Sequence, residues 1–215
     1  MKKIVIYGAG GLGRELAYLI EIINEKKLTY DIVGFLEDGV SYPVGTMVNN
    51  YKVVGNGDWL KNHLDVSCVC AIANVKIRKK VFEKYIPFGI NFETIIAPSV
   101  IIHPTTIVGK GCIIAGGCGL SVNITLEEGV FLNGAVVIGH DVHIGSFSTI
   151  FPRTDISGYC DIGSQVTIGG HSFITPGKKI GDNAIVAAGS IVFSNVKAGT
   201  TVLGNPAKRM RAIED

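Results

Sequence analysis

The sequence carries little charge, and almost none of it is in excess of one sign. Asp, Glu, Lys and Arg together make up 18% of the 215 residues, and the formal net charge is +2. Proteins that bind nucleic acid concentrate Lys and Arg on one face or along one helix. The charge balance therefore gives no support to a nucleic-acid partner, and we expect none.

Long apolar runs are also missing. No stretch approaches the roughly 18 apolar residues that a membrane-spanning helix needs. The residues Met1–Ile6 could open a signal peptide, but Gly8 and Gly10 interrupt the apolar run and Arg14 follows soon after. We therefore expect a cytoplasmic protein with no membrane span and no cleaved leader.

Cysteine is scarce, and its arrangement does not suggest disulfides or a zinc site. The chain has five cysteines, an odd number, and no His/Cys spacing resembles a known zinc motif. Three of them, Cys112, Cys118 and Cys160, recur at one position of a six-residue repeat. The other two, Cys68 and Cys70, lie in an apolar run. We interpret them as small buried side chains in a reduced compartment and expect no metal.

The most informative feature that the sequence does have is that six-residue repeat. From Ile96 to Val192, every sixth residue is Ile, Leu or Val, seventeen times in succession without an insertion. By chance such a run has a probability on the order of 10⁻⁸. Helices repeat near 3.6 residues and half-buried strands near 2, so a period of six fits neither. It indicates a parallel β-helix whose aliphatic side chains point inward.

The residue after each aliphatic is usually small, as at Gly139, Gly145 and Gly181. We attribute this to the corners of each coil, where a sharp turn favours compact residues. Phe151 and Phe193 break the rule. We expect these exposed rings to face a neighbouring subunit, and we predict a homotrimer.

The first 93 residues follow a different pattern, in which short apolar runs alternate with amphipathic segments. The predicted strands and helices are, in order, Lys3–Tyr7 (strand), Gly11–Lys27 (helix), Ile32–Leu36 (strand), Val66–Ala73 (strand) and Val75–Tyr85 (helix). This order is typical of βαβ units with a parallel sheet. We predict a Rossmann-like α/β half-domain over residues 1–93 and a β-helix over residues 94–215.

A glycine-rich turn joins the first predicted strand to the first predicted helix. Gly8-x-Gly10-x-x-Gly13 satisfies the dinucleotide-binding fingerprint in this context, and Glu37 and Asp38 follow the second strand where a ribose-binding acid would lie. The plain alternative is a tight turn between strand and helix without a ligand. An NAD-binding site is a second alternative, although the other half of such a fold is absent.

Several motifs in this order resemble one known family. They are Tyr7-Gly8-Ala9-Gly10-Gly11-Leu12-Gly13-Arg14-Glu15, Gly34-Phe35-Leu36-Glu37-Asp38, Ile138-Gly139-His140-Asp141 and the closing Gly204-Asn205-Pro206-Ala207-Lys208. Together they resemble the bacterial sugar O/N-acyltransferases, which include sialic-acid O-acetyltransferases and nucleotide-linked 4-amino-sugar N-acetyltransferases. The spacing by itself establishes only the period of six. The resemblance adds that the β-helix is three-sided and left-handed and that the protein uses acetyl-CoA.

The resemblance implies that His140 is the general base and that Asp141 supports it. An imidazole titrates near pH 6.5, so it is able to accept a proton from an attacking amine or hydroxyl at neutral pH. The plain alternative is an exposed His on a polar corner. Four other histidines compete for the role, with His143 the most serious rival: His63, His103, His143 and His171.

The same resemblance assigns the binding residues. The nucleotide part of the substrate would contact Gly10, Gly11, Leu12, Glu37, Asp38 and Asn74, and the sugar would contact Asn133. Acetyl-CoA would contact Thr149, Gly158, Gly170 and Ala188. By charge rather than by resemblance, five cations toward the C-terminal coils could pair with the CoA phosphates, with an ordinary solvated charge as the plain alternative for each: Lys178, Lys179, Lys197, Lys208 and Arg209. Thr149 departs from the pattern, because many family members have a second His there. Asn133 has a plain alternative, a corner residue that tolerates an unusual backbone angle.

These observations predict an acetyl-CoA-dependent N-acetyltransferase acting on a nucleotide-linked 4-amino-deoxy sugar in bacterial glycan synthesis, of an O-antigen or a glycoprotein. The amine would attack the thioester directly. O-acetylation of sialic acid or a related sugar is the nearest alternative. A metal-binding or otherwise non-catalytic β-helix is an alternative from another class. It would need three histidines placed as ligands of one metal ion, and the separations between the histidines in the sequence do not favour such a cluster.

Overall fold

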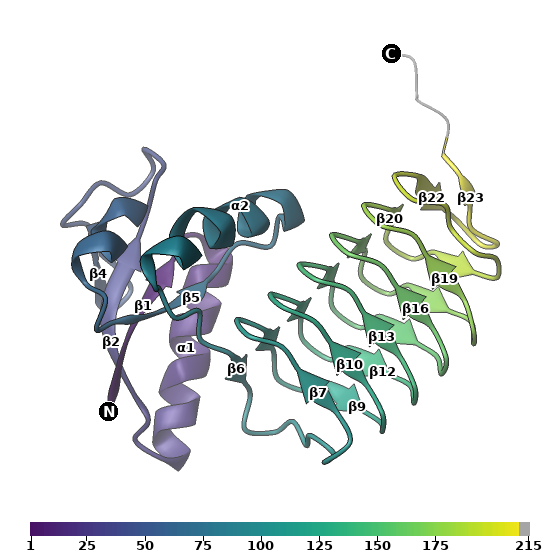
Figure 1. Cartoon of the computed structure of the whole chain (residues 1–215), viewed down its shortest axis with the longest axis horizontal. Helices are drawn as coiled ribbons and strands as arrows, with labels where there is room; N and C mark the ends of the chain where they lie inside the picture. Colours follow the sequence, from purple (N-terminus) through teal and green to yellow (C-terminus); the bar gives the residue numbers. More distant parts are fainter. Residues whose placement is uncertain (211–215) are drawn as a thin grey trace. The chain divides into compact units, whose positions relative to one another are not determined.

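The computed structural model describes residues 1–210, and the chain divides into two compact units. The first is Met1–Pro98 and the second begins at Ser99. This division lies five residues beyond the end of the predicted first domain, residue 93. Residues 211–215, the end of the predicted second domain, lie outside the described residues. Each unit is described by itself (Figure 1).

The first unit is built on a small twisted sheet with the strand order β3-β4-β2-β1-β5. Its strands are β1 (Lys2–Tyr7), β2 (Tyr30–Leu36), β3 (Met47–Val48), β4 (Tyr51–Gly55) and β5 (Ser67–Cys70). The neighbours β4, β2, β1 and β5 pair in parallel, whereas β3 pairs antiparallel with β4. The remaining elements are α1 (Gly11–Lys26), η1 (Gly57–Asn62), α2 (Val75–Tyr85), η2 (Ile86–Phe88) and β6 (Ile95–Ile96).

The prediction of a parallel βαβ arrangement is confirmed, and α2 has the predicted bounds. The β3–β4 hairpin was not predicted. Its two strands are joined by Asn49-Asn50, and Asn49 adopts a left-handed φ of 52°. An Asn pair between two short apolar segments is a hairpin signal, so this turn was open to prediction.

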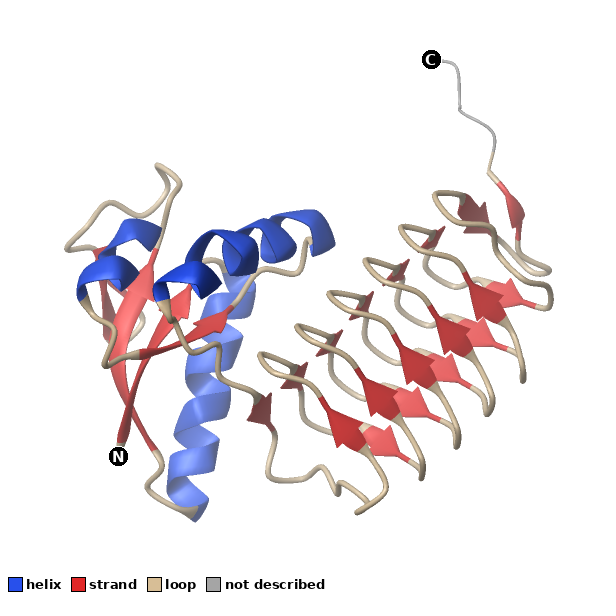
Figure 2. Cartoon of the chain, in the orientation of Figure 1, coloured by secondary structure: helices blue, strands red, loops and turns tan. Residues whose placement is uncertain are grey.

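The second unit consists of short strands and turns that wind into a three-sided prism (Figures 1 and 2). One face contains β7 (Ile107–Val108), β10 (Thr125–Leu126), β13 (His143–Ile144), β16 (Asp161–Ile162) and β19 (Lys179–Ile180). Another contains β9 (Gly119–Leu120), β12 (Val137–Ile138), β15 (Asp155–Ile156), β18 (Phe173–Ile174) and β21 (Ile191–Val192). The third contains β8 (Ile113–Ile114), β11 (Phe131–Leu132), β14 (Thr149–Ile150), β17 (Thr167–Ile168), β20 (Ile185–Val186), β22 (Thr201–Leu203) and β23 (Lys208–Arg209).

Strands of successive coils pair in parallel with a constant offset. Phe131 pairs with Thr149, for example, and Thr149 pairs with Thr167. Three hexads therefore make one coil, and the predicted left-handed parallel β-helix is confirmed. The antiparallel strand β23 pairs with β22 beyond the last full coil. Among residues 1–210, no helix has the length and apolar character needed to cross a lipid bilayer.

The aliphatic members of the repeat form the core of the prism. Leu126, Ile162 and Val186 are fully buried, as predicted for inward-pointing side chains. Val108 and Leu120 are partly exposed, because β7 and β9 are the edge strands of their faces. Each buried Leu or Ile contributes about 1.5–3 kcal/mol of hydrophobic stabilisation, so the full stack supplies most of this unit's stability.

A second inward position carries Ser, Thr, Cys or Val and links neighbouring coils. The side chains of Ser148 and Cys160 donate to backbone carbonyl groups 15 residues further along, on Gly163 at 2.7 Å and Thr175 at 3.3 Å. A buried hydroxyl needs such a partner, and the neighbouring coil supplies it. Lys178 is the exception at this position, and it is partly exposed. All five cysteines are buried free thiols, as predicted from their positions.

The explanation offered for the small residue after each aliphatic is wrong. A Cβ at Gly145 would lie 2.6 Å from the backbone of Gly163 and Ser164 in the next coil, and Gly145 does not adopt a positive φ. The left-handed corner residues lie two positions further along the chain, for example Asp141 and Phe147. Close coil stacking, rather than a sharp turn, explains the glycines at these positions, such as Gly145 and Gly181.

We expect Gly145→Ala to lower the thermal unfolding midpoint by several degrees, because the added methyl group must push two coils apart. Overpacking of this kind costs about 1–3 kcal/mol. Gly199→Asn is the matched control, since Gly199 has a left-handed φ of 66° and open space around it. Thermal melts followed by circular dichroism measure both variants, and equal midpoints would contradict the stacking explanation.

Candidate active site

His140 follows β12 at an outer corner of the prism, where its side chain is 49% exposed. Its Nδ1 lies 2.8 Å from Oδ2 of Asp141. An ionised carboxylate only accepts hydrogen bonds, so Nδ1 carries the proton and donates it. The lone pair of Nε2 is then the basic site of the ring.

Asp141 is held in place by its backbone and by the preceding coil. Its φ of 58° is left-handed, a conformation that Asp tolerates better than most residues. Nδ2 of Asn123, which occupies the same corner position one coil earlier, donates to Oδ1 of Asp141 at 3.0 Å. The hydrogen bond from His140, and then that from Asn123, lowers the pKa of Asp141, so this carboxylate is ionised at neutral pH.

Two residues of the next coil border the imidazole of His140. A methyl group at Gly158 would lie 2.7 Å from both Cε1 and Nε2 of the ring, so only glycine leaves it room. The ring of Tyr159 meets the imidazole edge to face, with centroids 4.8 Å apart. Gly158 was predicted to contact acetyl-CoA, whereas Tyr159 was not predicted. Its place one coil after Asp141, at the same corner position, was the available signal.

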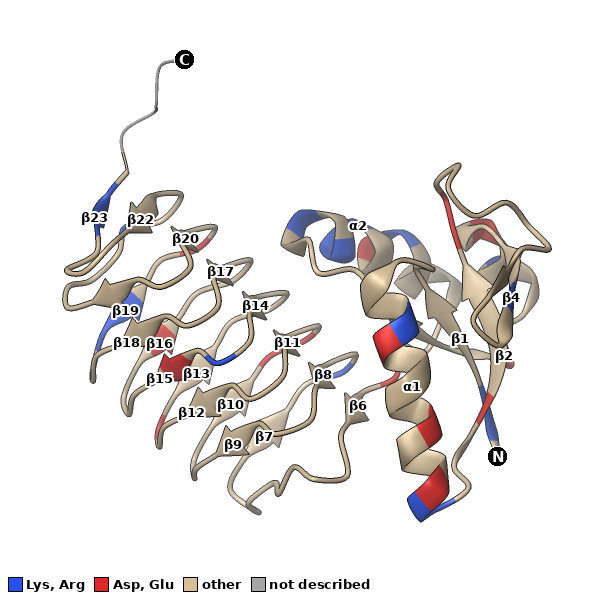
Figure 3. Cartoon of the chain, turned by 180° about the vertical axis from the view of Figure 1, so that it is seen from behind, with Lys and Arg blue, Asp and Glu red and all other residues tan. Residues whose placement is uncertain are grey.

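His143, the principal rival, is engaged on both ring nitrogens. Nδ1 lies 3.0 Å from Oδ1 of Asp161 and Nε2 lies 3.0 Å from Oε1 of Glu127, on the face where β16 and β19 also carry charge (Figure 3). Burial opposes the imidazolium form, but the hydrogen bonds to Asp161 and Glu127 outweigh it and raise the pKa of His143. Because both ring nitrogens of His143 face carboxylates, neither is available to a substrate, which leaves His140 as the candidate base.

The other histidines also have local partners. Nδ1 of His103 lies 2.9 Å from Oγ1 of Thr105, and His63 stacks on Trp59 with centroids 3.5 Å apart. His171 is exposed and occupies a left-handed corner. Within the described part of the chain, no three side chains of His, Cys, Asp or Glu are grouped as a metal site would require.

The remaining predicted residues of the prism lie away from the His140 corner. Thr149 is in β14 on another face, and its side chain is buried. Gly170 and Ala188 lie one coil apart at the corner that follows β17 and β20. Oδ1 of Asn133 accepts from the N–H of Gly134 at 2.7 Å. Asn133 does not have the left-handed φ suggested as its alternative explanation.

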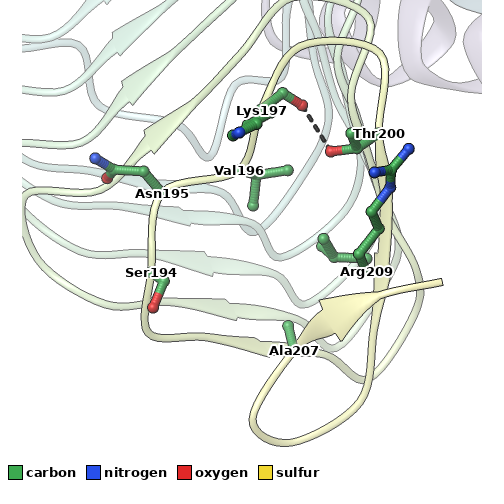
Figure 4. A pocket seen from close by; sticks show the side chains of 8 residues that line it. Ser194, Asn195, Val196, Lys197, Thr200, Ala207 and Arg209 are labelled. Carbon is green, nitrogen blue, oxygen red and sulfur yellow. Dashed lines mark hydrogen bonds between the residues drawn. The ribbon is translucent and has the colours of Figure 1, made fainter.

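A cavity of about 280 Å³ lies at the end of the prism, beside β22 and β23 (Figure 4). Lys197 and Arg209 supply positive charge to its lining, together with the polar side chains of Asn195 and Thr200. Lys208, the predicted residue, is exposed on β23 next to this cavity but does not line it. Lys197 and Arg209 are thus the two cations that line this cavity.

In the first unit, the three glycines of the fingerprint have different roles. Gly8 adopts a left-handed φ of 109°, and a Cβ at Gly13 would lie only 1.9 Å from the carbonyl oxygen of Gly8. Both are therefore required by the fold. Gly10 and Gly11 have open space around them, and α1 begins after Gly10 with no side-chain cap. The first N–H groups of this helix are thus available to an anion.

The two acids after β2 brace this loop. Glu37 accepts from the N–H of Ala9 at 3.0 Å, which ties it to the glycine-rich turn. Asp38 accepts from the hydroxyl of Tyr7 and, at 2.8 Å, from the N–H of Gly57. Burial, and then the contact with Asp38, raises the pKa of Tyr7, which therefore stays protonated as a donor.

Asn74 has a structural role at the start of α2. Its side-chain oxygen accepts from the N–H groups of Lys76 and Ile77, both at 3.1 Å, and so caps the helix. The exposed side chain leaves its amide NH₂ free to donate to a ligand. Gly10, Gly11, Leu12, Glu37, Asp38 and Asn74 all lie in loops or helix starts after strands β1, β2 and β5.

The two carboxylates that contact His143, those of Glu127 and Asp161, form the His143 clamp. This clamp makes the stability of the folded protein depend on pH. The folded pKa of His143 is raised above the ordinary value of about 6.5, so the stabilisation is complete below that pH and is lost as pH rises through the folded pKa. We expect the thermal midpoint of the native protein to fall across this window above pH 6.5, and that of His143→Gln to fall less. His103→Gln is the control, and an equal slope in all three proteins would contradict the clamp.

Comparisons with known proteins identify relatives of the chain. Residues 3–85 match the family described as the PglD N-terminal domain. Over 214 residues the chain is 33% identical to the GDP-perosamine N-acetyltransferase of Escherichia coli O157:H7, an alignment that covers 96% of this chain and 95% of that protein.

Solved structures extend the likeness to both units. The acetyltransferase domain of PglB from Neisseria gonorrhoeae FA1090, in complex with acetyl coenzyme A, is 28% identical with a TM-score of 0.89 over 97% of this chain and 99% of that one. WeeI from Acinetobacter baumannii AYE is 28% identical with a TM-score of 0.87 over 96% and 99%. The resemblance noted in the sequence is confirmed, and the chain belongs to the family of hexapeptide-repeat sugar acetyltransferases that includes GDP-perosamine N-acetyltransferase.

Proposed function

We propose that the protein transfers the acetyl group of acetyl-CoA to the amine of a nucleotide-linked 4-amino-deoxy sugar, with His140 as the general base. The observation that carries the proposal is the His140–Asp141 pair, which leaves Nε2 free at an exposed corner of the prism. Membership of the sugar acetyltransferases, with an N-acetyltransferase among the relatives, supports the amine as acceptor.

His140 and Asp141 divide the proton transfer between them. Nε2 of His140 accepts the proton that the amine loses as its nitrogen forms a bond to the thioester carbon. The carboxylate of Asp141 stabilises the resulting imidazolium through Nδ1. The imidazolium then returns the proton to the departing thiolate of CoA, which balances the reaction without a covalent enzyme intermediate.

The first unit supplies the residues for the nucleotide. The N–H groups at Gly11 and Leu12 begin α1 beside the open Gly10, a setting suited to a phosphate group. Glu37 and Asp38 retain unused acceptor capacity, because each carboxylate oxygen has two lone pairs. Asn74 contributes its free amide NH₂ at the neighbouring strand end.

The second unit supplies the residues for acetyl-CoA, in a groove between adjacent prisms of a homotrimer. Gly158 beside His140 marks the reacting end, and Gly170 and Ala188 supply further contacts to acetyl-CoA. Because the side chain of Thr149 is buried, this residue contributes only indirectly, by shaping its face of the prism. Asn133 contacts the sugar of the acceptor. The cations of Lys197, Lys208 and Arg209 suit the CoA phosphates. The 54% exposure of Phe193 supports a subunit contact. Five buried thiols suit the cytoplasm, where we place this step of bacterial glycan synthesis.

The first test is thiol release from acetyl-CoA with a panel of acceptors. The panel contains UDP-, dTDP- and GDP-linked 4-amino-4,6-dideoxy sugars and sialic acid. We expect release with an amino sugar, and a loss of kcat of about 10²–10⁴-fold in His140→Ala, because general-base catalysis contributes about that much. His143→Gln is the matched control and should retain kcat.

Three outcomes of this test would contradict the proposal. Release with sialic acid alone would assign O-acetylation instead. Loss of activity in His143→Gln but not in His140→Ala would move the base to His143. If the protein were monomeric by light scattering yet fully active, acetyl-CoA could not bind in a groove between subunits.

The glycine-rich loop gives a second test, of nucleotide binding. Gly10→Ala should leave the thermal midpoint unchanged, because nothing lies within 4 Å of its added Cβ, yet should raise the KM for the nucleotide sugar at least fivefold. Gly13→Ala should lower the thermal midpoint, because its Cβ meets Gly8 at 1.9 Å. An unchanged KM in Gly10→Ala would place the nucleotide elsewhere.

A further inference from the structure

Tyr159 contacts His140, the proposed base, through its aromatic ring. Its ring meets the imidazole of His140 at an interplanar angle of 86°, with centroids 4.8 Å apart, and its backbone N–H donates to the carbonyl of His140 at 2.9 Å. Tyr159 is also 66% exposed. A large aromatic side chain that remains in solvent while touching a single functional ring is not explained by core packing.

The backbone at this position makes a tyrosine unfavourable. Tyr159 has a left-handed φ of 60°, which is an outlier conformation for a bulky side chain. The equivalent corner positions in the neighbouring coils are Asn123, Asp141 and Gly177, the residue types that this conformation favours. Phe147, Arg153 and Gln165 also have a left-handed φ at corners of the prism, so it is the contact with His140, and not the backbone conformation alone, that distinguishes Tyr159.

Three neighbours together restrict the imidazole. Asp141 holds Nδ1, the missing side chain of Gly158 opens the space that the ring fills, and Tyr159 stands edge-on beside it. Rotation of the ring about its Cβ–Cγ bond would break the hydrogen bond to Asp141 and bring the ring against Tyr159. Nε2 is therefore held in one place, beside Gly158, on a side chain that is 49% exposed.

We propose that Tyr159 is a positioning residue that holds His140 in its catalytic orientation by ring contact. The proposal rests on the proposed role of His140 as base. It assigns the effect to the aromatic ring rather than to the phenol hydroxyl, because the described contact is between the two rings. Misplacement of a catalytic group by about 1 Å costs up to about 10²-fold in rate.

The test compares Tyr159→Asn with Tyr159→Phe. Asn suits the left-handed corner, since Asn123 occupies the equivalent position two coils earlier with a φ of 58°. We expect Tyr159→Asn to lower kcat about tenfold or more, with the KM for both substrates within about twofold, and Tyr159→Phe to retain native kcat. Gln165→Asn is the matched control at another corner, where Asn183 has the equivalent place in the next coil.

Two further readouts separate positioning from mere stability. The pH profile of kcat/KM should change in Tyr159→Asn and not in Tyr159→Phe, with Asp141 and the phenol of Tyr159 as the titratable groups beside His140. The ¹⁵N spectrum of the His140 side chain should show the single Nδ1–H tautomer in the native protein and a mixture in Tyr159→Asn.

Each contrary result has a distinct meaning. Native kcat, pH profile and tautomer in Tyr159→Asn would overturn the proposal. Equal losses in Tyr159→Asn and Tyr159→Phe would overturn it by assigning the effect to the hydroxyl, and a change confined to KM would overturn it by making Tyr159 a substrate contact. If the native protein released no thiol, the proposed function would fail, while the tautomer comparison would still test the contact.

Discussion

The stacking of one coil directly on the next is the constraint on which the second unit depends. The backbones approach so closely that a single methyl group after the inward aliphatic, as at Gly145 or Gly181, would lie within 2.4–2.6 Å of the coil above. Parallel strand pairs and the small inward hydroxyl and thiol groups then connect successive coils. The same spacing brings side chains at equivalent positions of successive coils into contact, so the chain assembles its corners from distant residues without long loops.

The candidate site is a direct product of this stacking. Asn123, Asp141 and Tyr159 occupy one corner position in three successive coils. The first orients the carboxylate, the second orients the imidazole by its own hydrogen bond, and the third borders the imidazole. At the left-handed corner, His140 and Asp141 are consecutive, and their side chains are joined by a hydrogen bond of 2.8 Å.

The fold was largely open to prediction because its signals are periodic or local. Seventeen regular aliphatics define the coil, and the bounds of α2 were predicted correctly. The apolar spacing of Ile77, Val81 and Phe82 suggested one buried face, but Ile77 is 50% exposed and Arg78 is buried instead. The errors came where stacking matters: the small residues after the aliphatics are explained by the next coil, and Tyr159 becomes adjacent to His140 only once the register between coils is applied. His143 could not be set aside from sequence, because Glu127 and Asp161 reach it from two other coils. The hydrogen bonds of the two acids were likewise not predictable from the sequence. Glu37 accepts from the N–H of Ala9, and Asp38 accepts from Tyr7 and Gly57, which the fold brings to it from other elements.

The constant register also limits how such a protein can change length during evolution. Inserting or deleting one whole coil leaves every remaining side chain on its own face and every corner in its own column, because each coil contacts only its neighbours. A change of one residue within a coil would instead shift all later aliphatics out of the interior. Descendants of this prism are therefore expected to differ in height by whole coils, and to accept other insertions only as loops that leave the prism at a corner.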